Sequence, residues 1–223
     1  GLVECHALRP TEDGWEVDEQ SLADASSSDQ AGTFLARRLD RLPDKTIRLL
    51  STGAVLGKQF EFQAASQLAG MTPSEVIEAL EVARSRQLLW IRPDGSECVF
   101  VHDKIRSALL DLLSTEQLQA QHREVARYLL DHAPDRVSDI AYHFDAGNDS
   151  IAALPFAVKA AEQARRQYAL EVAEQQYEIA LRGTSSDEGR LEIMEGLGNS
   201  LMLRGRYEEA GTWFEAAAPL AGA

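Results

Sequence analysis

The commonest pattern along the chain is an apolar residue at every third or fourth position, the spacing of one face of an α-helix. The clearest case follows Thr72, where Pro73 stands in the first turn and Glu75, three residues after Thr72, completes a capping box. A further helical run begins at Asp103. In the first half of the chain the pattern predicts helices over residues 33–42, 44–57, 62–69 and 72–87.

Short alternating stretches interrupt this helical spacing. Residues 88–92 and 98–102 predict two strands, and the Asp-Gly within the intervening PDGSE is a strong hairpin signal. Residues 1–18 predict two further short strands around a Pro-to-Gly turn, and a polar linker follows at 24–32. Three helices followed by a hairpin is the order of a winged helix-turn-helix, so we expect that fold over residues 31–113.

From Ser114 onward the pattern predicts helices alone. They are expected over residues 115–133, 137–146, 150–166, 169–182, 188–203 and 206–217. The last two match the pattern of a tetratricopeptide repeat, in which small residues let two helices approach closely. We therefore predict a mainly α protein, with a winged helix-turn-helix domain and small β-hairpins followed by a tetratricopeptide-like solenoid over residues 114–223.

A looser copy of the repeat lies 37 residues earlier in the chain. There Ala173, Tyr177 and Ala180 correspond to Ala210, Phe214 and Ala217. We expect the aromatic residues Tyr207 and Phe214 to fill the space between helix pairs. Because the sequence ends on PLAGA without a polar capping helix, we also expect the solenoid to continue beyond residue 223.

Composition narrows the class of protein. Of the 223 residues 44% are hydrophobic, enough for a core, yet no apolar run approaches the ~18–20 residues that span a bilayer. The first residues mix Glu, His and Arg and do not form a signal peptide. Cys5 and Cys98 have neither metal-ligand spacing nor a disulfide framework, which favours two free thiols in a reducing, cytoplasmic compartment. We expect no membrane partner.

The net charge of −14 argues against direct binding of nucleic acid, whose phosphates it repels. The third helix and hairpin of the expected winged helix would read DNA, but they carry five acidic side chains against three basic ones. These are Glu75, Glu78, Glu81, Asp94 and Glu97 against Arg84, Arg86 and Arg92. The sequence therefore favours an interaction or regulatory winged helix.

Motifs for catalysis are missing from the sequence. There is no GxxxxGK[ST] loop, and the nearest stretch, AVLGKQF, lacks the Ser or Thr that follows the lysine. Neither GxSxG nor HExxH occurs. We predict no catalytic residue, no metal site and no enzyme within these residues. His122, His132 and His143 are expected to be surface or interhelix histidines, and Trp15, Trp90 and Trp213 are expected to be core residues.

One His-Asp pair stands at a corner between strand and helix, within VFVHDKIRSALLDLL at 99–113. In a structural interpretation the Asp103 carboxylate caps the helix, Val99 and Val101 face inward by alternation, and His102 is half-buried. In a functional interpretation the pair contacts a ligand. The residues alone leave both interpretations open.

The segment FVHDKIRSALLDLL resembles the Met-His-Asp motif region of the STAND class, the signal-transduction ATPases with numerous domains. That class includes apoptosome and plant immune-receptor proteins and large ATP-binding bacterial regulators. Val101 replaces the methionine, while His102 and Asp103 match. Residues 34–70 resemble the winged-helix region of the bacterial members, and 140–164 resemble the helical arm that follows it.

The resemblance implies a P-loop ATPase domain before the winged helix, with residues 1–30 forming a hairpin and linker after it. In that family the motif histidine contacts the β-phosphate of ADP in the closed state. By position, His102 is then the candidate phosphate sensor and Asp103 orients its corner, both only with the ATPase domain present. ADP or ATP belongs to the full-length protein, and no cofactor is expected in this fragment.

We therefore expect a regulatory fragment whose helical repeats bind a protein partner or inducer, with the ATPase domain as a partner in cis. Two alternatives stay open. One is a transcriptional regulator whose winged helix binds DNA, and the other is a structural scaffold with a packed histidine.

Overall fold

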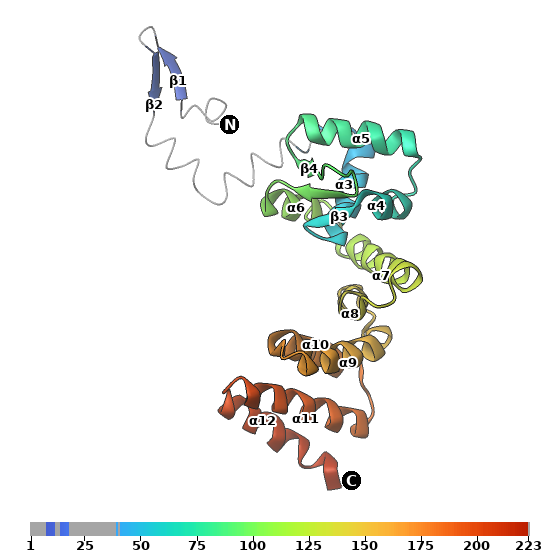
Figure 1. The fold of residues 1–223 in the computed structure, drawn as a ribbon, viewed down its shortest axis with the longest axis vertical. Coiled ribbons are helices and arrows are strands. Elements are labelled where there is room, and N and C mark those ends of the chain that lie inside the picture. The colour runs from blue at the N-terminus through green and yellow to red at the C-terminus, as the bar shows by residue number, and fades with distance from the viewer. Residues whose placement is uncertain (1–7, 12–13, 18–38, 40, 223) are drawn as a thin grey trace. The chain divides into compact units, whose positions relative to one another are not determined.

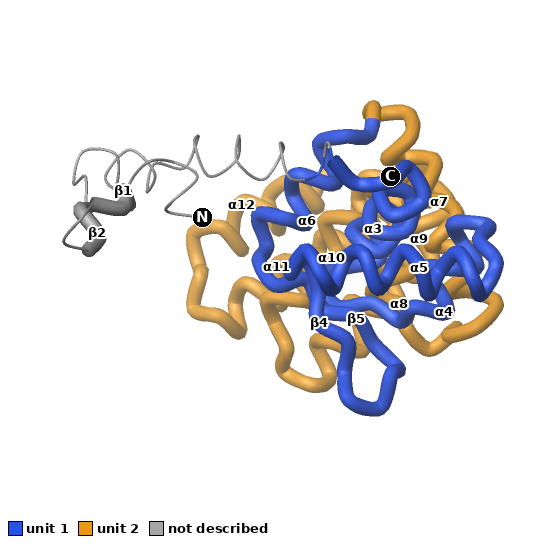
Figure 2. The backbone as a smooth tube through the Cα atoms, turned by 90° about the horizontal axis from the view of Figure 1, so that it is seen from above, with its two compact units in different colours: residues 1–113 blue, residues 114–223 orange. Residues whose placement is uncertain are grey.

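The computed structural model describes residues 8–11, 14–17, 39 and 41–222, most of them helical (Figure 1). The mainly α class expected from the sequence is thereby confirmed. The chain divides into two compact units, Gly1–Leu113 and Ser114–Ala223, which Figure 2 colours separately. Within the described residues, no helix combines the length and apolar character needed to cross a membrane.

Unit 1 interleaves helices with short strands. In chain order its elements are β1 Leu8–Thr11, β2 Gly14–Val17, α3 Asp44–Leu56, β3 Gln59–Glu61, α4 Phe62–Leu68, α5 Pro73–Ser85, β4 Leu89–Ile91, β5 Glu97–Phe100 and α6 Asp103–Leu110. The strands β1 and β2 pair antiparallel, as expected for a hairpin in residues 1–18. The other strands form one antiparallel sheet in the order β3-β5-β4.

Strand β3 is the element of this sheet that the sequence pattern did not predict. It has three residues, of which Phe60 is buried between exposed Gln59 and Glu61. Its partner β5 lies nearly forty positions later in the chain, with Phe60 opposite Cys98. The Phe60 and Phe100 rings lie 5.3 Å apart between centroids. Three residues are too few to show an alternating pattern of apolar and polar positions. The strand forms because it pairs with β5, which is distant in the sequence.

The register of the sheet reverses the expected orientation of β5. Cys98 and Phe100 face the core with exposed fractions of 0% and 1%, whereas Val99 and Val101 are partly exposed. The expectation of an inward-facing side chain is therefore wrong for Val99. Side chains alternate between the two faces of a sheet, and the core lies on the side of Phe60, so Cys98 and Phe100 take the inner positions. Val101 packs at the margin of that core.

Helix α5 begins as its sequence predicts. The Thr72 side chain accepts a hydrogen bond from the Glu75 amide, and the Glu75 carboxylate accepts one from the Thr72 amide at 2.9 Å. The same carboxylate lies 2.8 Å from Lys45 Nζ, which joins the start of α5 to α3. The Lys45 hydrogen bond, together with those from Thr72, lowers the pKa of Glu75 to about 2.

Unit 2 consists of consecutive helices packed on their neighbours in the chain (Figure 1). They are α7 Thr115–His132, α8 Val137–Ala146, α9 Ser150–Arg166, α10 Leu170–Gly183, α11 Asp187–Leu203, α12 Tyr207–Ala217 and the 3₁₀ turn η1 Leu220–Gly222. Every helix expected after Ser114 is present, and the bounds of each differ from the prediction by at most one residue.

The small residues of the predicted repeat are buried in unit 2. Ala173, Ala180, Ala210 and Ala217 have exposed fractions of 0–3%. Glycines admit the aromatic rings: a Cβ added at Gly196 would lie 2.5 Å from the Tyr177 ring, and one at Gly198 would lie 2.6 Å from the Phe214 ring. Phe214 is partly buried, against α11 of its own pair.

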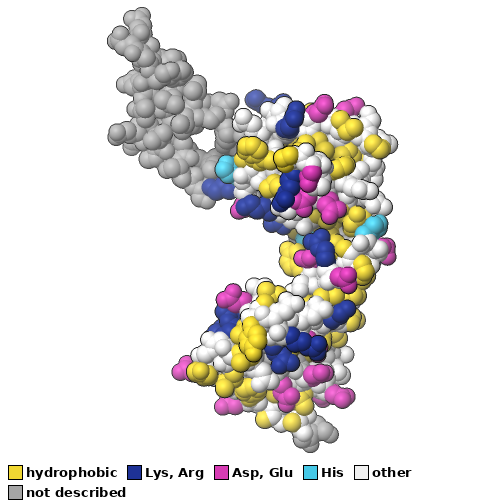
Figure 3. Space-filling view, in the orientation of Figure 1, with side chains coloured by type: hydrophobic (Ala, Val, Ile, Leu, Met, Phe, Trp, Pro, Cys, Tyr) yellow, Lys and Arg dark blue, Asp and Glu magenta, His cyan; other side chains and the backbone are white. Residues whose placement is uncertain are grey.

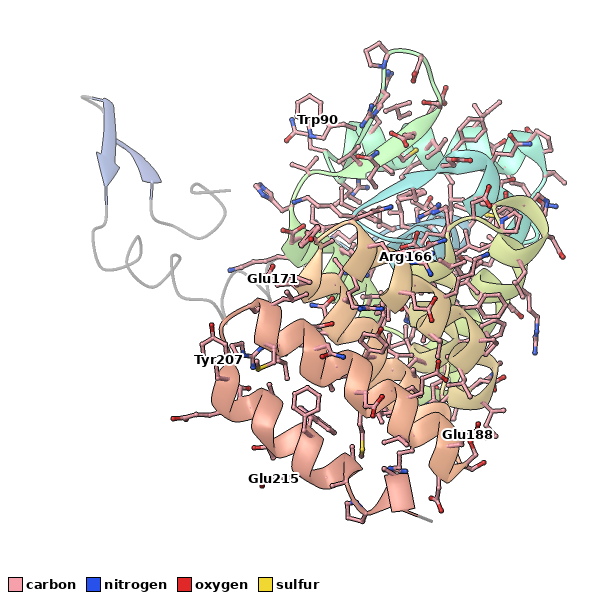
Figure 4. The ribbon with its side chains drawn as sticks, turned by 60° about the horizontal axis from the view of Figure 1, so that its bottom comes forward. Trp90, Arg166, Glu171, Glu188, Tyr207 and Glu215 are labelled. Carbon is pink, nitrogen blue, oxygen red and sulfur yellow. The ribbon has the colours of Figure 1, made fainter. Side chains whose placement is uncertain are left out.

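Two aromatic residues expected inside the protein are exposed. Tyr207 is the first residue of α12 and is 65% exposed at the N-terminal end of that helix (Figure 4). Trp90 is 67% exposed, because β4 turns Leu89 toward the core and Trp90 to the other side of the sheet. In Figure 4 its ring projects away from the hairpin. Trp213 is half-buried on α12.

Ion pairs connect one helix pair of unit 2 to the next, and on the face drawn in Figure 3 basic and acidic side chains lie side by side. Arg182 of α10 donates two hydrogen bonds, at 2.9 and 2.6 Å, to Asp145 of α8. Glu174 of α10 accepts from Arg204 and Arg206, which flank the turn between α11 and α12. These contacts fix one helix pair against the next.

Several sequence predictions fall outside the described residues. They are the linker at 24–32, nearly all of the helix at 33–42, the thiol of Cys5 and the side chain of Trp15.

Candidate functional site

His102 occupies the corner between β5 and α6. It is the N-cap residue of α6, with extended backbone angles of φ −141° and ψ 143°, and its carbonyl accepts from the Ile105 amide at 3.0 Å. Its side chain makes no capping hydrogen bond and is exposed. Within the described part of the chain, no hydrogen bond or ion pair engages the imidazole. The expectation of a half-buried, satisfied histidine is therefore wrong.

Asp103 is the first residue inside α6 rather than its cap. Its carboxylate oxygens lie 3.0 and 3.2 Å from Nζ of Lys58, the residue just before β3. Among the described residues no backbone amide donates to this carboxylate, so the capping interpretation is wrong. A carboxylate in the first turn still interacts favourably with the helix dipole. Lys58 was missed because nothing near position 103 in the sequence points to a partner so distant.

The corner rests on a well-packed helix. Ile105 and Leu109 of α6 are buried in the core of unit 1, with exposed fractions of 1% and 0%. Arg106 Nε donates to the Ala54 carbonyl of α3 at 2.8 Å, and Ser107 Oγ donates to the Asp103 carbonyl at 3.2 Å. The imidazole is thus presented to solvent by a backbone that packing and hydrogen bonds hold in place.

Chemically, this corner can donate hydrogen bonds to an anion. An imidazole offers a ring N–H, and the first amides of a helix lack intrahelical partners. Lys58 adds a positive charge, although Asp103 already balances it. Anionic phosphate is a suitable ligand for such a corner. No group of three or more His, Cys, Asp and Glu side chains that could hold a metal ion occurs among the described residues.

Two other histidines form a buried pair between α7 and α8. Nδ1 of His122 lies 2.9 Å from Nδ1 of His143, and the side chains are 5% and 4% exposed. The edge of the Tyr142 ring packs against His122. His132 is exposed, and its Nδ1 lies 2.9 Å from the Tyr128 carbonyl oxygen. The expected interhelix location thus applies to His122 and His143, but no sequence pattern indicates that they pair.

A hollow of about 170 Å³ lies between α9, α10 and α11. Its lining combines an apolar surface with carboxylates, one arginine and one amide. The residues are Val158, Glu162, Arg165, Tyr177, Glu192, Ile193, Glu195, Gly196 and Asn199. No sequence motif indicates this site, because it depends on α9 and α11 lying next to each other.

The lining of the hollow carries more acidic than basic side chains. Glu162 lies 3.6 Å from Arg166 on its own helix, while Glu192 and Glu195 form no ion pair with any described residue. Arg165 is the basic residue of the lining. Burial raises the pKa of the Tyr177 hydroxyl, an effect that Arg165 opposes and that Glu162 and Glu192 reinforce.

The Cys98 thiol is buried in the core of unit 1. Burial raises its pKa to about 11, so at neutral pH it is a protonated, unreactive thiol.

No protein-family model matches this chain, and neither do any curated proteins or solved structures.

Proposed function

We propose that the chain is the regulatory and protein-interaction region of a multidomain signalling ATPase of the STAND class. In this proposal unit 1 is a winged helix that responds to bound nucleotide, and unit 2 is a tetratricopeptide-like solenoid that binds a protein partner or inducer. The observation that carries it is the exposed imidazole of His102, which has no described partner and stands at the start of a firmly packed helix.

The order of elements in unit 1 supports the winged-helix assignment. Helix α3, strand β3, helices α4 and α5 and the β4–β5 hairpin follow one another, and the strands meet in one small sheet. This order is typical of a helix-turn-helix with a wing. The paired helices and small buried residues of unit 2 support the solenoid assignment.

The surface of α5 supports an interaction module over a DNA reader. This helix would enter the major groove, yet its exposed residues include Ile77, Glu78 and Glu81. The carboxylates of Glu78 and Glu81 repel the phosphates of DNA. We therefore expect that duplex DNA does not bind the 223-residue chain with micromolar affinity, even at low salt.

In the proposed mechanism His102 donates a hydrogen bond to the β-phosphate of ADP. A contact made in the ADP-bound state alone stabilises that state relative to the others, so losing it shifts the population. The Lys58–Asp103 ion pair holds the start of α6 against the residue before β3, which positions the histidine.

The test measures ADP released on denaturing the full-length protein, for wild type and for His102→Ala. A hydrogen bond to a charged phosphate is worth ~1.5–3 kcal/mol, so we expect the variant to bind ADP about tenfold or more weakly. His132→Ala, which removes an exposed histidine of unit 2, is the matched control and should retain ADP as wild type does.

Equal ADP in wild type and His102→Ala would make His102 a structural corner and overturn the sensor role. No ADP in either protein would overturn the ATPase assignment and favour the scaffold.

A further inference from the structure

We infer that the hollow between α9, α10 and α11 binds the side chain of an arginine presented by a peptide segment of a partner protein. The inference rests on the proposed function, in which unit 2 is the partner-binding surface. It adds the chemical class of that partner and the place where the partner binds.

The size of the hollow suits one long side chain. Its volume of about 170 Å³ slightly exceeds that of engineered protein cavities of ~150 Å³ that hold a benzene molecule. The apolar part of its lining comes from Val158 and from the nearly buried Ile193 and Tyr177, and the methylene stem of an arginine can lie against this part.

Gly196 keeps this surface open. A Cβ added there would lie 2.5 Å from Cζ of Tyr177 and 2.7 Å from its hydroxyl oxygen. The absence of a side chain lets the ring lie directly against the backbone of α11.

The charge of the hollow selects a cation. Three carboxylates, Glu162 of α9 with Glu192 and Glu195 of α11, stand around it against the single guanidinium of Arg165. Glu192 and Glu195 pair with no described residue, so both are available to a ligand. Carboxylates and a guanidinium form bidentate, charge-assisted hydrogen bonds, which favours arginine as the cation.

The negative net charge of unit 2 also favours a cationic ligand. Residues 114–223 carry 18 Asp and Glu side chains against 10 Lys and Arg. Such a field attracts cationic segments and repels nucleic acid and acidic peptides. The partner is therefore a protein with an exposed basic segment.

The test follows backbone amide shifts of the ¹⁵N-labelled 223-residue chain by NMR during titration with two peptides. One is Ac-Gly-Arg-Gly-NH₂, and the other replaces arginine by citrulline, which has nearly the same shape but no charge. We expect the arginine peptide to shift the amides of Gly196 and its neighbours on α11, with millimolar affinity that weakens between about 0.01 and 0.15 M ionic strength. The citrulline peptide should leave them in place.

Three variants assign the binding to the hollow. Loss of one exposed ion pair corresponds to about two- to threefold in affinity, so Glu192→Gln with Glu195→Gln should weaken binding about fivefold. Arg165→Gln should strengthen it about twofold, a gain that a misfolded protein would not give. Glu188→Gln, on the same helix but outside the hollow (Figure 4), should match wild type.

Equal shifts with the citrulline peptide, or unchanged affinity in the double variant, would overturn the inference. The ADP measurement concerns His102 in unit 1, and this titration concerns unit 2. Arginine binding without retained ADP would defeat the proposed ATPase role alone, and retained ADP without arginine binding would defeat this inference alone.

Discussion

At Gly183 two backbones of unit 2 lie very close together. A Cβ added there would overlap the carbonyl oxygen of Ser150 at the start of α9. Because this neighbour is backbone, it cannot move aside as a flexible side chain could. We expect Gly183→Ala to lower the free energy of unfolding by ~1–3 kcal/mol, measured by urea denaturation followed by circular dichroism.

Gly211→Ala is the matched control for this substitution. Gly211 lies within α12, and an added Cβ there meets nothing within 4 Å. Alanine favours a helix over glycine by ~0.5–1 kcal/mol, so this variant should be more stable than wild type. A destabilised Gly211→Ala, or a neutral Gly183→Ala, would contradict the packing at these two sites.

Glu75 makes the stability of unit 1 depend on acidity. Its pKa is lowered to about 2 by hydrogen bonds from Lys45 and Thr72, whereas in the unfolded chain it is near its ordinary value of 4.5. The stabilisation is therefore present in full above pH 4.5 and is lost as the pH falls toward about 2. We expect Glu75→Gln to lower the urea midpoint at pH 7 and to have little effect near pH 2.

Glu81→Gln, exposed on the same helix, provides the comparison for Glu75. It should leave the urea midpoint of unit 1 almost unchanged at neutral pH. If Glu75→Gln and Glu81→Gln behaved alike, the Lys45 and Thr72 contacts would contribute no stability.

At the level of single residues, the sequence predicts the features that depend on residues close together in the chain. The capping box at Thr72 and Glu75 involves residues three apart, and the structure contains it. The exposure of Trp90 depends on which face of the β3-β5-β4 sheet is buried. That choice is set by Phe60 on a strand distant in sequence, so alternation alone assigned β5 to the wrong face.

Helices were easier to predict than strands for a physical reason. An amphipathic helix repeats its apolar position several times, as α9 does over residues 150–166, so its pattern is read from one stretch of sequence. Strand β3 has three residues and is stable because β5 pairs with it. No local pattern contains that pairing.

For the molecule as a whole, the Cys98 thiol provides a chemical probe of unit 1. It has an exposed fraction of 0% and a pKa of about 11, so a thiol reagent reaches it when the core opens. In a Cys5→Ser background we expect slow labelling in buffer and labelling in urea that follows the unfolding of unit 1. Ser85→Cys, at an exposed position, should react at once, and equally fast labelling of Cys98 without urea would contradict its burial.

The candidate sites differ in how far sequence alone could locate them. His102 and Asp103 are adjacent, so a resemblance to a short motif was enough to single them out. The hollow takes residues from α9, α10 and α11, and its charge imbalance exists because α9 and α11 are neighbours. Predicting it would require the packing of the helices as well as their existence.

The helices of unit 2 contact mainly their neighbours in the chain, and this has an evolutionary consequence. A helix pair can be duplicated or deleted without disturbing contacts elsewhere in the array. Each insertion between existing pairs would bring with it another hollow bounded by three consecutive helices, whose selectivity could diverge by changing a few lining residues. Lineages could in this way lengthen the stretch of a ligand that is recognised, one side chain at a time, while the rest of the protein stays the same.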